Sequence, residues 1–469
     1  MNRRHFLRNS AMAGAGATLF SSTIGKAQNV DFTGKGKKAK NVIMFISDGM
    51  STGTLNMMDL FKLRQYGSGS NWLQLYRENR VSRALMDTAS ANSIVTDSAA
   101  ASSSFGGGQR VKNGSLNISP DGKPNLPILQ KFKKSGKKTG CVTSVTITHA
   151  TPAGFCITQD NRGDQAAIAE KYLEGKFDVL MGGGDQYFNP ELRKDKKDLY
   201  SEFQKVGYQI AKTRKELLSL KGNSPVLGIF SDGALPYSID RKSSKELTEK
   251  TPTLAEMTSK AIDVLKDHPE GFVLQVEGGK VDWAAHANDI AGLLYDQFAF
   301  DDAIKVALDF AEKNEDTLLI MTTDHGNANP GTISGSSAND QFDSIANYTQ
   351  TNEWLLNQIS SESSLNEIKD LIFRANGIEL SQEEVEHIYS YYHGLNKESG
   401  LYNYKKLPFE TYAKMQKSRN SVGWISMSHS GDYVELAMYG PGSEYLEPYM
   451  LNTDIHYLML QATEVENRF

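Results

Sequence analysis

Cysteine is nearly absent from this sequence, and long hydrophobic runs are missing after its first residues. Cys141 and Cys156 are the only cysteines, too few for a disulfide scaffold, and both one disulfide and two buried free thiols remain open for them. No apolar run beyond residue 27 approaches the roughly 18 to 20 residues that a membrane helix needs. We therefore expect a soluble mature protein with no membrane span.

Basic patches and nucleotide-binding motifs are also missing. The net charge is −5 over 469 residues, and no basic stripe or tail is present, which argues against a nucleic-acid or anionic-membrane partner. There is no dinucleotide fingerprint and no Walker-type loop, and we expect the glycine triplets at 106–108 and 182–184 to form tight turns. With 39% hydrophobic and 23% charged residues, the composition is that of a globular protein.

The first 27 residues have the pattern of an export signal. Arg3 and Arg4 precede a mild apolar run at residues 11–20, and a small-residue site ends at Ala27. This order is typical of a twin-arginine signal cleaved near Ala27, and a basic, frayed N-terminus is the alternative. By the same charge count, cleavage leaves a net charge of about −9. We predict a periplasmic or secreted protein, exported already folded by the twin-arginine route.

Short apolar runs alternate with amphipathic stretches along residues 40–469. We expect strands at residues 41–47, 139–145, 177–181, 226–230, 272–276, 317–321 and 433–438, and helices at residues 125–135, 164–174, 253–267 and 291–314. Apolar strands separated by helices predict an α/β fold with a largely parallel central sheet that helices flank on both faces. Ligands of such sheets bind beyond the carboxyl ends of the strands.

Residues 334–419 differ from the rest because they contain no strand-like core run. Their aromatic and charged residues follow helical spacing, and Ser381 followed by Glu384 predicts a capping box at a helix start. We expect a helical insertion that packs over the active rim of the sheet or builds a subunit contact. An accessory lobe without catalytic chemistry is the other interpretation.

Candidate metal ligands follow two of the predicted strands. Asp324 and His325 come just after the apolar run at 317–321, and a carboxylate oxygen with an imidazole nitrogen suits zinc. Asp48 closes another strand. Because the ends of parallel strands share one edge of a sheet, these three residues form one candidate site.

A second candidate site combines a helical pair with a distant histidine. Asp282 and His286 stand at i and i+4, on one face of a helix, and His429 would supply a third ligand if the fold brings it in. Most isolated pairs with this spacing bind nothing. Two adjacent cations with three protein ligands each would leave open positions for an oxyanion, the arrangement for in-line phosphoryl displacement.

Ser98 is the candidate nucleophile. The small residues after Asp97 suggest that Ser98 lies at a helix N-terminus, where free backbone amides favour a phosphate. A free serine hydroxyl is a poor nucleophile near neutral pH, so Ser98 would need a metal ion beside it. The alternative is that Ser98 is only a helix cap.

Taken together, these motifs resemble those of the alkaline phosphatases, metal-dependent phosphomonoesterases with the alkaline phosphatase-like fold. The resemblance runs from about Asn41 to the final strand and excludes most of the insertion. It rests on several motifs in the family's order, at residues 41–50, 96–100, 149–154, 275–278, 282–286, 323–327 and 429–431.

The resemblance implies a role for each candidate residue. The implied sets are Asp282, His286 and His429 for a first zinc; Asp48, Asp324 and His325 for a second zinc, with Ser98 beside it; and Asp48, Thr151 and Glu277 for a third site, usually magnesium. Oxygen ligands suit magnesium. Arg162 matches the phosphate-clamping arginine of the family, whose planar fork holds two oxygens at once.

Two positions depart from the enterobacterial members of the family. His149 stands where those carry an aspartate beside the third metal, and Trp283 stands where they carry a lysine that reaches phosphate through water. Other branches carry this histidine, and some marine bacterial members pair it with tryptophan. The imidazole leaves magnesium and zinc both open for the third site. Without the lysine charge, product phosphate is expected to leave faster.

The implied activity is hydrolysis of phosphate monoesters to alcohol and inorganic phosphate through a covalent phosphoserine at Ser98. A phosphodiesterase or another esterase of the same superfamily is the first alternative, and a non-catalytic exported binder of phosphate or metal is the second. A sulfatase would need a Cys/Ser-x-Pro-x-Arg motif, which residues 97–101 lack. The family is usually dimeric, so a homodimer is one option for this chain, and the insertion could either create or block the dimer contact.

Overall fold

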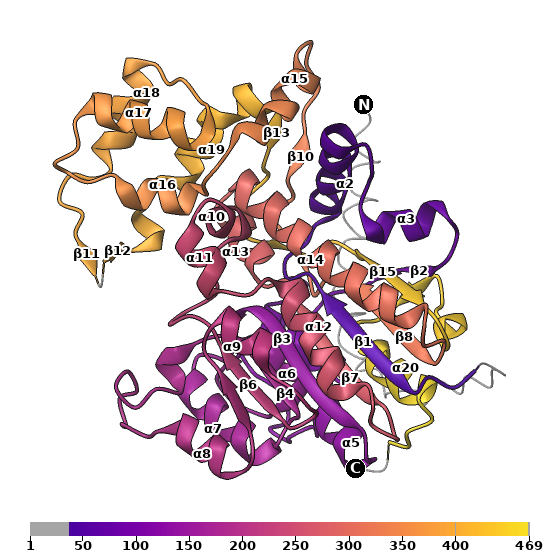
Figure 1. Cartoon of the computed structure of the whole chain (residues 1–469). Helices are drawn as coiled ribbons and strands as arrows, with labels where there is room; N and C mark the ends of the chain where they lie inside the picture. The colour runs from indigo at the N-terminus through magenta and orange to yellow at the C-terminus, as the bar shows by residue number, and fades with distance from the viewer. Residues whose placement is uncertain (1–36, 399, 468–469) are drawn as a thin grey trace, which may run out of the picture. The chain divides into compact units, whose positions relative to one another are not determined.

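A ten-stranded sheet forms the centre of the fold (Figure 1). The structure is a computed structural model that describes residues 37–398 and 400–467, so the expected export signal lies outside the described residues. In spatial order the strands are β16 (Tyr449–Met450), β2 (Ser82–Met86), β15 (Val434–Tyr439), β8 (Thr317–Thr322), β1 (Asn41–Ile46), β7 (Phe272–Glu277), β3 (Lys138–Thr146), β4 (Val179–Gly183), β6 (Val226–Ile229) and β5 (Gln209–Ala211).

The sheet is largely parallel, as predicted. Only β15 runs against its neighbours β2 and β8, and every other pairing in the sheet is parallel. All seven predicted strands are present. The three that were not predicted, β2, β5 and β16, lie toward the two edges of the sheet, where a strand needs no continuous apolar run.

Helices cover both faces of the sheet, and alternate residues of β1 show the two cores. Ile43 and Phe45 enter one core, and Phe45 meets the Phe300 ring edge-on at 5.8 Å between centroids. Val42 and Met44 enter the other core. All of these side chains are buried, which explains why the strand is apolar from Val42 to Ile46.

The helices sort by the core that they bury. The first core takes side chains from α2 (Thr52–Tyr66), α3 (Asn71–Arg77), α9 (Arg214–Ser219), α10 (Ser238–Lys242), α12 (Leu254–Leu265), α13 (Lys280–His286) and α14 (Ile290–Ala311). The second takes them from α4 (Ser98–Gly107), α5 (Ile128–Lys134), α6 (Ala150–Cys156), α7 (Gln165–Gly175), α8 (Leu199–Lys205) and α20 (Asp454–Ala462). A short helix α11 (Lys245–Lys250) follows α10. Across the described ranges, no helix is both long and apolar enough to cross a bilayer.

The expectation of tight turns holds only for the third glycine of each triplet, because Gly108 and Gly184 have the left-handed backbone of a turn and the other four glycines lie in regular elements. Gly106 and Gly107 lie within α4, and a Cβ atom on Gly106 would come within 1.9 Å of the Gly154 carbonyl oxygen in α6. Likewise, Gly182 and Gly183 belong to β4. These glycines are needed mainly because backbone approaches backbone, a cause that a glycine-rich sequence does not distinguish from a turn.

The segment at 334–419 is built mostly of helices. Its elements are α15 (Ala338–Asp343), α16 (Asn352–Gln358), α17 (Leu365–Asn376), α18 (Gln382–Ser390) and α19 (Phe409–Asn420), with a hairpin of β11 (Lys397–Glu398) and β12 (Leu401–Tyr402). The predicted capping box is present at the start of α18, between Ser381 and Glu384. β10 (Gly331–Thr332) pairs with β13 (Val422–Gly423), so the segment leaves and returns at one place.

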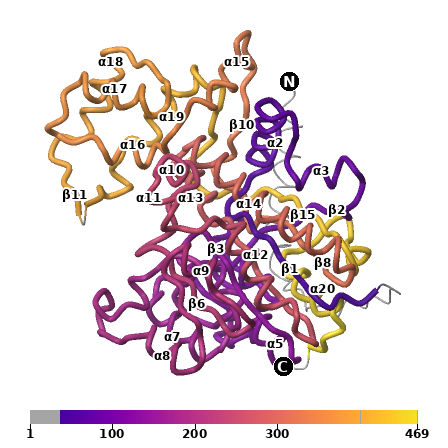
Figure 2. Tube along the Cα trace, viewed as in Figure 1, coloured from indigo at the N-terminus to yellow at the C-terminus, as the bar shows by residue number. Residues whose placement is uncertain are grey.

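Two carboxylates, of which Asp289 is buried, join this segment to the rest of the fold at the start of α16. Asp240, in α10, accepts hydrogen bonds from the Thr351 backbone and hydroxyl, both at 2.7 Å. Asp289, just before α14, accepts one from the Asn352 backbone at 2.5 Å. The Cα trace in Figure 2 accordingly shows α16 beside α10. The segment is therefore tied both to α10 and to Asp289, which follows His286 by three residues.

Candidate metal centre

The carboxyl ends of three adjacent strands build the centre. β1 lies between β7 and β8, and the three are parallel. Asp48 comes two residues after β1, Glu277 ends β7, and Asp324 comes two residues after β8. All three carboxylates are fully buried. The strand pairing therefore brings together acidic groups that are far apart in sequence.

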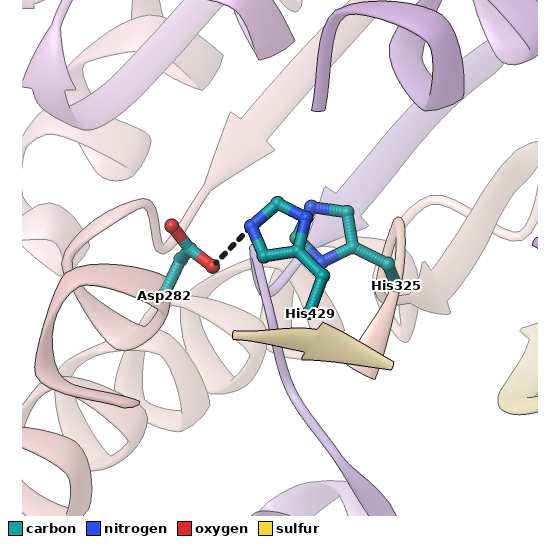
Figure 3. A group of neighbouring side chains, drawn as sticks. All are labelled: Asp282, His325 and His429. Atoms are coloured by element: carbon teal, nitrogen blue, oxygen red, sulfur yellow. Dashed lines mark ion pairs between the residues drawn. The ribbon is translucent and has the colours of Figure 1, made fainter. Parts of the chain in front are cut away.

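Three groups of side chains in the described residues have the geometry to hold a metal ion. They are Asp282, His325 and His429 (Figure 3); Asp48, Asp324 and His325; and Asp48, His149 and Glu277. Within each group the candidate ligand atoms lie within 4.8 Å of one another. Two residues are shared between groups, Asp48 and His325, so the three groups form one continuous cluster.

His325 lies at the centre of this cluster. Its Nε2 is 3.5 Å from Asp48 Oδ1 and 3.3 Å from Asp324 Oδ2. The rings of His325 and His429 stack with 3.7 Å between centroids. This stacking depends on the pairing of β14 (His429–Ser430) with β9 (Gly326–Asn327), which places the late strand beside the residue that follows His325.

His286 and His429 both face Asp282. His286 Nε2 lies 3.4 Å from Asp282 Oδ2, and His429 Nε2 lies 3.4 Å from Asp282 Oδ1. The two Nε2 atoms are 3.1 Å apart. The structure thus brings together all three residues that the sequence analysis grouped around a first metal, with His325 close by as a fourth.

Main-chain carbonyls fix the orientation of these imidazoles. His286 Nδ1 lies 2.7 Å from the Met427 oxygen, and His429 Nδ1 lies 2.9 Å from the Thr96 oxygen. Because a carbonyl only accepts, each Nδ1 donates, so the Nε2 atom that faces Asp282 is the atom left to bind a metal once it has no proton. Histidines that bind metals in proteins commonly donate their other ring N–H to a carbonyl in this way.

The third group combines oxygen ligands with one imidazole. His149 Nδ1 is 4.0 Å from Glu277 Oε1, and the Thr151 hydroxyl donates to Asp48 Oδ2 at 3.3 Å. The Thr143 hydroxyl donates a short hydrogen bond to Glu277 Oε2 and leaves Oε1 without a partner. The group therefore contains two of the predicted third-site residues, Asp48 and Glu277, with the predicted neighbour His149, and the third predicted residue, Thr151, bonds Asp48.

Ser98 points into this cluster. It is the first residue of α4, whose N-cap is Asp97, and its Oγ lies 3.4 Å from His325 Nε2. Because the Asp97 side chain makes the capping bond to the Ala100 amide, Ser98 does not serve as the helix cap. Ser98 is 2% exposed, and the helix N-terminus at which its hydroxyl lies favours an anionic ligand.

Arg162 lies at the edge of the cluster, held by two partners. Its Nη1 donates to Asp97 Oδ2 at 2.9 Å, and its Nη2 donates to His149 Nε2 at 3.1 Å.

The His149 ring meets the Trp283 ring edge-on, 6.3 Å between centroids. The ammonium of Lys280 lies 4.6 Å from the centre of the Trp283 ring. A cation therefore covers the tryptophan, although no lysine occupies its position.

Burial and mutual repulsion raise the pKa values of two acids of the cluster, Glu277 and Asp324, and a bound cation would oppose this rise. Burial raises the pKa of Glu277 to about 8. Burial and the charge of Asp282 raise the pKa of Asp324 to about 7. Burial disfavours the charge of His429, but its hydrogen bond to Asp282 raises its pKa to about 9. The acids are thus destabilised as anions wherever no cation faces them.

Unpartnered atoms show that the residues fit metal ions. Among the described residues, four buried side-chain atoms in this one cluster have no hydrogen-bond partner: Asp48 Oδ1, His149 Nδ1, Glu277 Oε1 and Asp324 Oδ2. Buried polar atoms without partners are rare because each costs about 1 to 3 kcal/mol. Carboxylate oxygens and imidazole nitrogens grouped in this way are the donor set of zinc and, in the oxygen-rich third group, of magnesium or zinc.

Several residues that support the centre were not predicted from the sequence. Thr143 holds Glu277, and its position directly opposite Glu277 in the β3–β7 register would have indicated it. Asn327 donates to Asp282 Oδ1 at 2.7 Å. The carbonyls of Thr96 and Met427 orient two histidines, and no sequence pattern marks a carbonyl.

A largely parallel sheet with clustered carboxylates and imidazoles at its strand ends defines an α/β protein with a candidate multinuclear metal centre. The alkaline phosphatase family matches residues 39–465. Alkaline phosphatase 4 of Bacillus subtilis is 31% identical over 94% of this chain and 91% of its own. The crystal structure of Thermus thermophilus alkaline phosphatase superposes with a TM-score of 0.84, at 32% identity over 92% of each chain.

These similarities extend over nearly all of the described chain. Repressible alkaline phosphatase of Saccharomyces cerevisiae is 30% identical over 86% of this chain and 76% of its own. The chain therefore belongs to the alkaline phosphatase family. It is a phosphoric monoester hydrolase of a metal-dependent family, and the fold and enzyme class predicted from sequence are confirmed.

Proposed function

We propose that this enzyme hydrolyses phosphate monoesters through a phosphoserine formed on Ser98. The observation that carries the proposal is the position of Ser98 Oγ, 3.4 Å from His325 Nε2 in a cluster of buried carboxylates and imidazoles. The N-terminus of α4, a ten-residue helix, adds free backbone amides that favour a phosphate beside this hydroxyl.

The reaction has two displacements at phosphorus. In the first, a bond forms between Ser98 Oγ and phosphorus while the bond from phosphorus to the alcohol oxygen breaks, and the alcohol leaves with a proton. In the second, a water oxygen bonds to phosphorus, the Ser98 bond breaks, and the serine regains its proton. Inorganic phosphate is released with net retention at phosphorus.

We propose two zinc ions and one magnesium ion as the resident metals, with zinc as the alternative at the third site. Asp282, His286 and His429 would hold the first zinc; Asp48, Asp324 and His325 the second; and Asp48, Thr151 and Glu277, with His149 beside them, the third metal. When bound, such ions supply positive charge to the oxygens at phosphorus and lower the pKa of a coordinated hydroxyl or water. The orphaned carboxylate and imidazole atoms support this assignment.

Arg162 is proposed to bind two non-bridging oxygens of the phosphoryl group. Asp97 holds one side of the guanidinium at 2.9 Å and presets its plane. The bond from Arg162 to His149 occupies the other side and is exchanged for phosphate oxygens when substrate binds. A monoester offers more free anionic oxygens to this fork than a diester does, which favours monoesters over the phosphodiesterase alternative.

Replacing Ser98 by alanine tests this function. The expected result is loss of phosphoenzyme on quenching with radiolabelled substrate and a fall in kcat of at least about a thousandfold, because no covalent step remains. The variant should retain its metals by elemental analysis, which separates a lost nucleophile from a lost site. Phosphoenzyme that survives in this variant would remove Ser98 from the mechanism.

A comparison of substrates completes the test. The purified enzyme should hydrolyse p-nitrophenyl phosphate much faster than its diester, and a chelator should abolish the activity until zinc and magnesium return. Faster diester cleavage would identify a phosphodiesterase instead. A protein that binds phosphate but turns over neither ester would be the non-catalytic binder.

We also propose that the enzyme works outside the cytoplasm. The support is the order of Arg3, Arg4, apolar residues and the small-residue site ending at Ala27. Replacement of both arginines by lysine should leave the precursor in the cytoplasm, as fractionation and immunoblotting would show. Periplasmic accumulation of that variant would exclude the twin-arginine route.

A further inference from the structure

Two isoleucines stand out because their side chains are almost fully exposed. Ile94 and Ile425 are each 81% exposed, whereas the next most exposed large apolar residue in the described part of the chain, Tyr66, is 61% exposed. A single exposed aliphatic residue is common and needs no explanation. These two, however, share a structural context.

Each isoleucine lies two residues before a carbonyl that orients a histidine of the metal centre. Ile94 precedes Thr96, which accepts the hydrogen bond from His429 Nδ1. Ile425 precedes Met427, which accepts the hydrogen bond from His286 Nδ1. The two most exposed apolar side chains therefore belong to the two loops that hold the imidazoles facing Asp282.

The loop that carries Ile94 has a fixed backbone. The Val95 amide donates to Ser93 Oγ at 3.1 Å, and the Val95 carbonyl accepts from Asn113 Nδ2 at 3.1 Å. A Cβ atom on Gly431 would come within 2.8 Å of the Ile94 carbonyl oxygen, so the chain after His429 packs directly on this loop. Ile94 is thus held beside the segment that carries His429.

The loop that carries Ile425 is equally well held. The Ile425 amide donates to the Ala328 oxygen at 3.0 Å, and the Ala328 amide donates to the Ser428 oxygen at 2.9 Å. A rigid loop that presents a β-branched apolar side chain to water gains nothing from it in the free protein. An apolar contact partner would explain the exposure.

Exposure of the metal-centre side chains shows on which side the centre opens. The side chains of His286 and His429 are 33% and 17% exposed, whereas those of Asp48, Asp324 and His325 are 0% exposed. A substrate phosphoryl group beside Ser98 is therefore enclosed on the His325 side. The more open side of the centre is that of His286 and His429, whose Nδ1 atoms bond the two loops that carry Ile425 and Ile94.

We propose that Ile94 and Ile425 contact the alcohol group of the substrate, so that the enzyme favours monoesters of apolar alcohols over those of small polar alcohols. The proposal rests on the proposed function, because it needs the phosphoryl group at Ser98. Full burial of one methylene corresponds to about a fourfold gain in affinity. Against side chains that stay partly in water, we expect about half of that free energy, or roughly twofold per methylene.

Straight-chain alkyl phosphates and alkylphosphonates, from ethyl to hexyl, test this directly. Their alcohols differ little in leaving-group pKa, so the chemical step stays constant along the series, and the phosphonates report binding alone by calorimetry. For the metal-loaded wild type, kcat/KM and phosphonate affinity should each rise about twofold per methylene. Ile94→Ser and Ile425→Ser should each reduce the slope, and the double variant should flatten it.

The control is Leu218→Ser, which removes a 49% exposed leucine from α9 and should keep the wild-type slope. A flat slope in the wild type, or an unchanged slope in the double variant, would overturn the proposal. So would sedimentation showing that the double variant dissociates a dimer, because the isoleucines would then cover a second copy of the chain. If even ethyl phosphate is not hydrolysed, the proposed function itself fails, a result distinct from a flat slope.

Discussion

Asp324 carries a charge that the metal-free protein accommodates poorly, and its replacement by asparagine tests the metal centre without measuring activity. The carboxylate is fully buried, and burial followed by the charge of Asp282 raises its pKa to about 7. Asparagine has nearly the same shape. Its Oδ1 can still accept from the Gly49 amide at 3.1 Å and the His325 amide at 3.0 Å.

The size of the expected change in stability follows from the difference between the folded-state pKa of Asp324 and its ordinary value. A folded-state pKa near 7 against an ordinary value of 3.8 means that ionised Asp324 costs the metal-free fold about 4 kcal/mol at pH 8. Because the pKa is raised on folding, the folded state holds the proton longer, and metal-free stability falls as pH rises from about 4 to about 7. Asp324→Asn should avoid this loss and raise the metal-free Tm at pH 8 by roughly 4 °C for a chain of this length.

With zinc and magnesium bound, Asp324→Asn should instead have a lower Tm than the wild type. The variant has lost a ligand, whereas the wild type is stabilised by metal binding. Differential scanning calorimetry at pH 5 and pH 8, with chelator and with metals, measures both signs. Asp296→Asn is the matched control: burial raises the pKa of Asp296 to about 7 as well, but it bonds Ser238 and lies outside the candidate metal groups, so its effect should not depend on metals. A lower metal-free Tm for Asp324→Asn at pH 8 would refute the reasoning.

Two other substitutions probe the surroundings of the centre. Trp283→Lys should strengthen inhibition by product phosphate because it restores a positive charge at that position, and an unchanged inhibition constant would count against that role for the charge. Gly106→Ala should lower the free energy of unfolding by at least about 2 kcal/mol, because the new Cβ would lie 1.9 Å from the Gly154 oxygen. Gly233→Ala, whose Cβ would meet nothing within 4 Å, should unfold in urea like the wild type.

The strands that build the site could be predicted because their continuous apolar sequences indicate strands buried on both faces. The run from Leu318 to Met321 is apolar at every position, and both of its faces are indeed buried. Once such strands are taken as parallel, Asp48 and Asp324 must share an edge. The same logic accounts for Glu277 at the end of β7.

Other parts of the site left no local trace in the sequence. His429 reaches His325 through the β9–β14 pairing of two residues on each strand, too short to produce a pattern. α4 consists largely of alanine, serine and glycine, and its helical form depends on contact with α6. In both cases a distant segment decides the structure, so only the resemblance to a family could indicate it beforehand.

Orientation of the imidazoles by main-chain oxygens has a consequence for how this enzyme can evolve. Every amino acid at positions 96 and 427 offers the same acceptor, so mutations there can alter side chains while the histidines keep their tautomer. The side chains at the neighbouring surface positions therefore have no part in orienting the metal ligands. Lineages of this enzyme can exchange the residues that meet the outer part of a substrate and acquire new preferences with the reaction chemistry left intact.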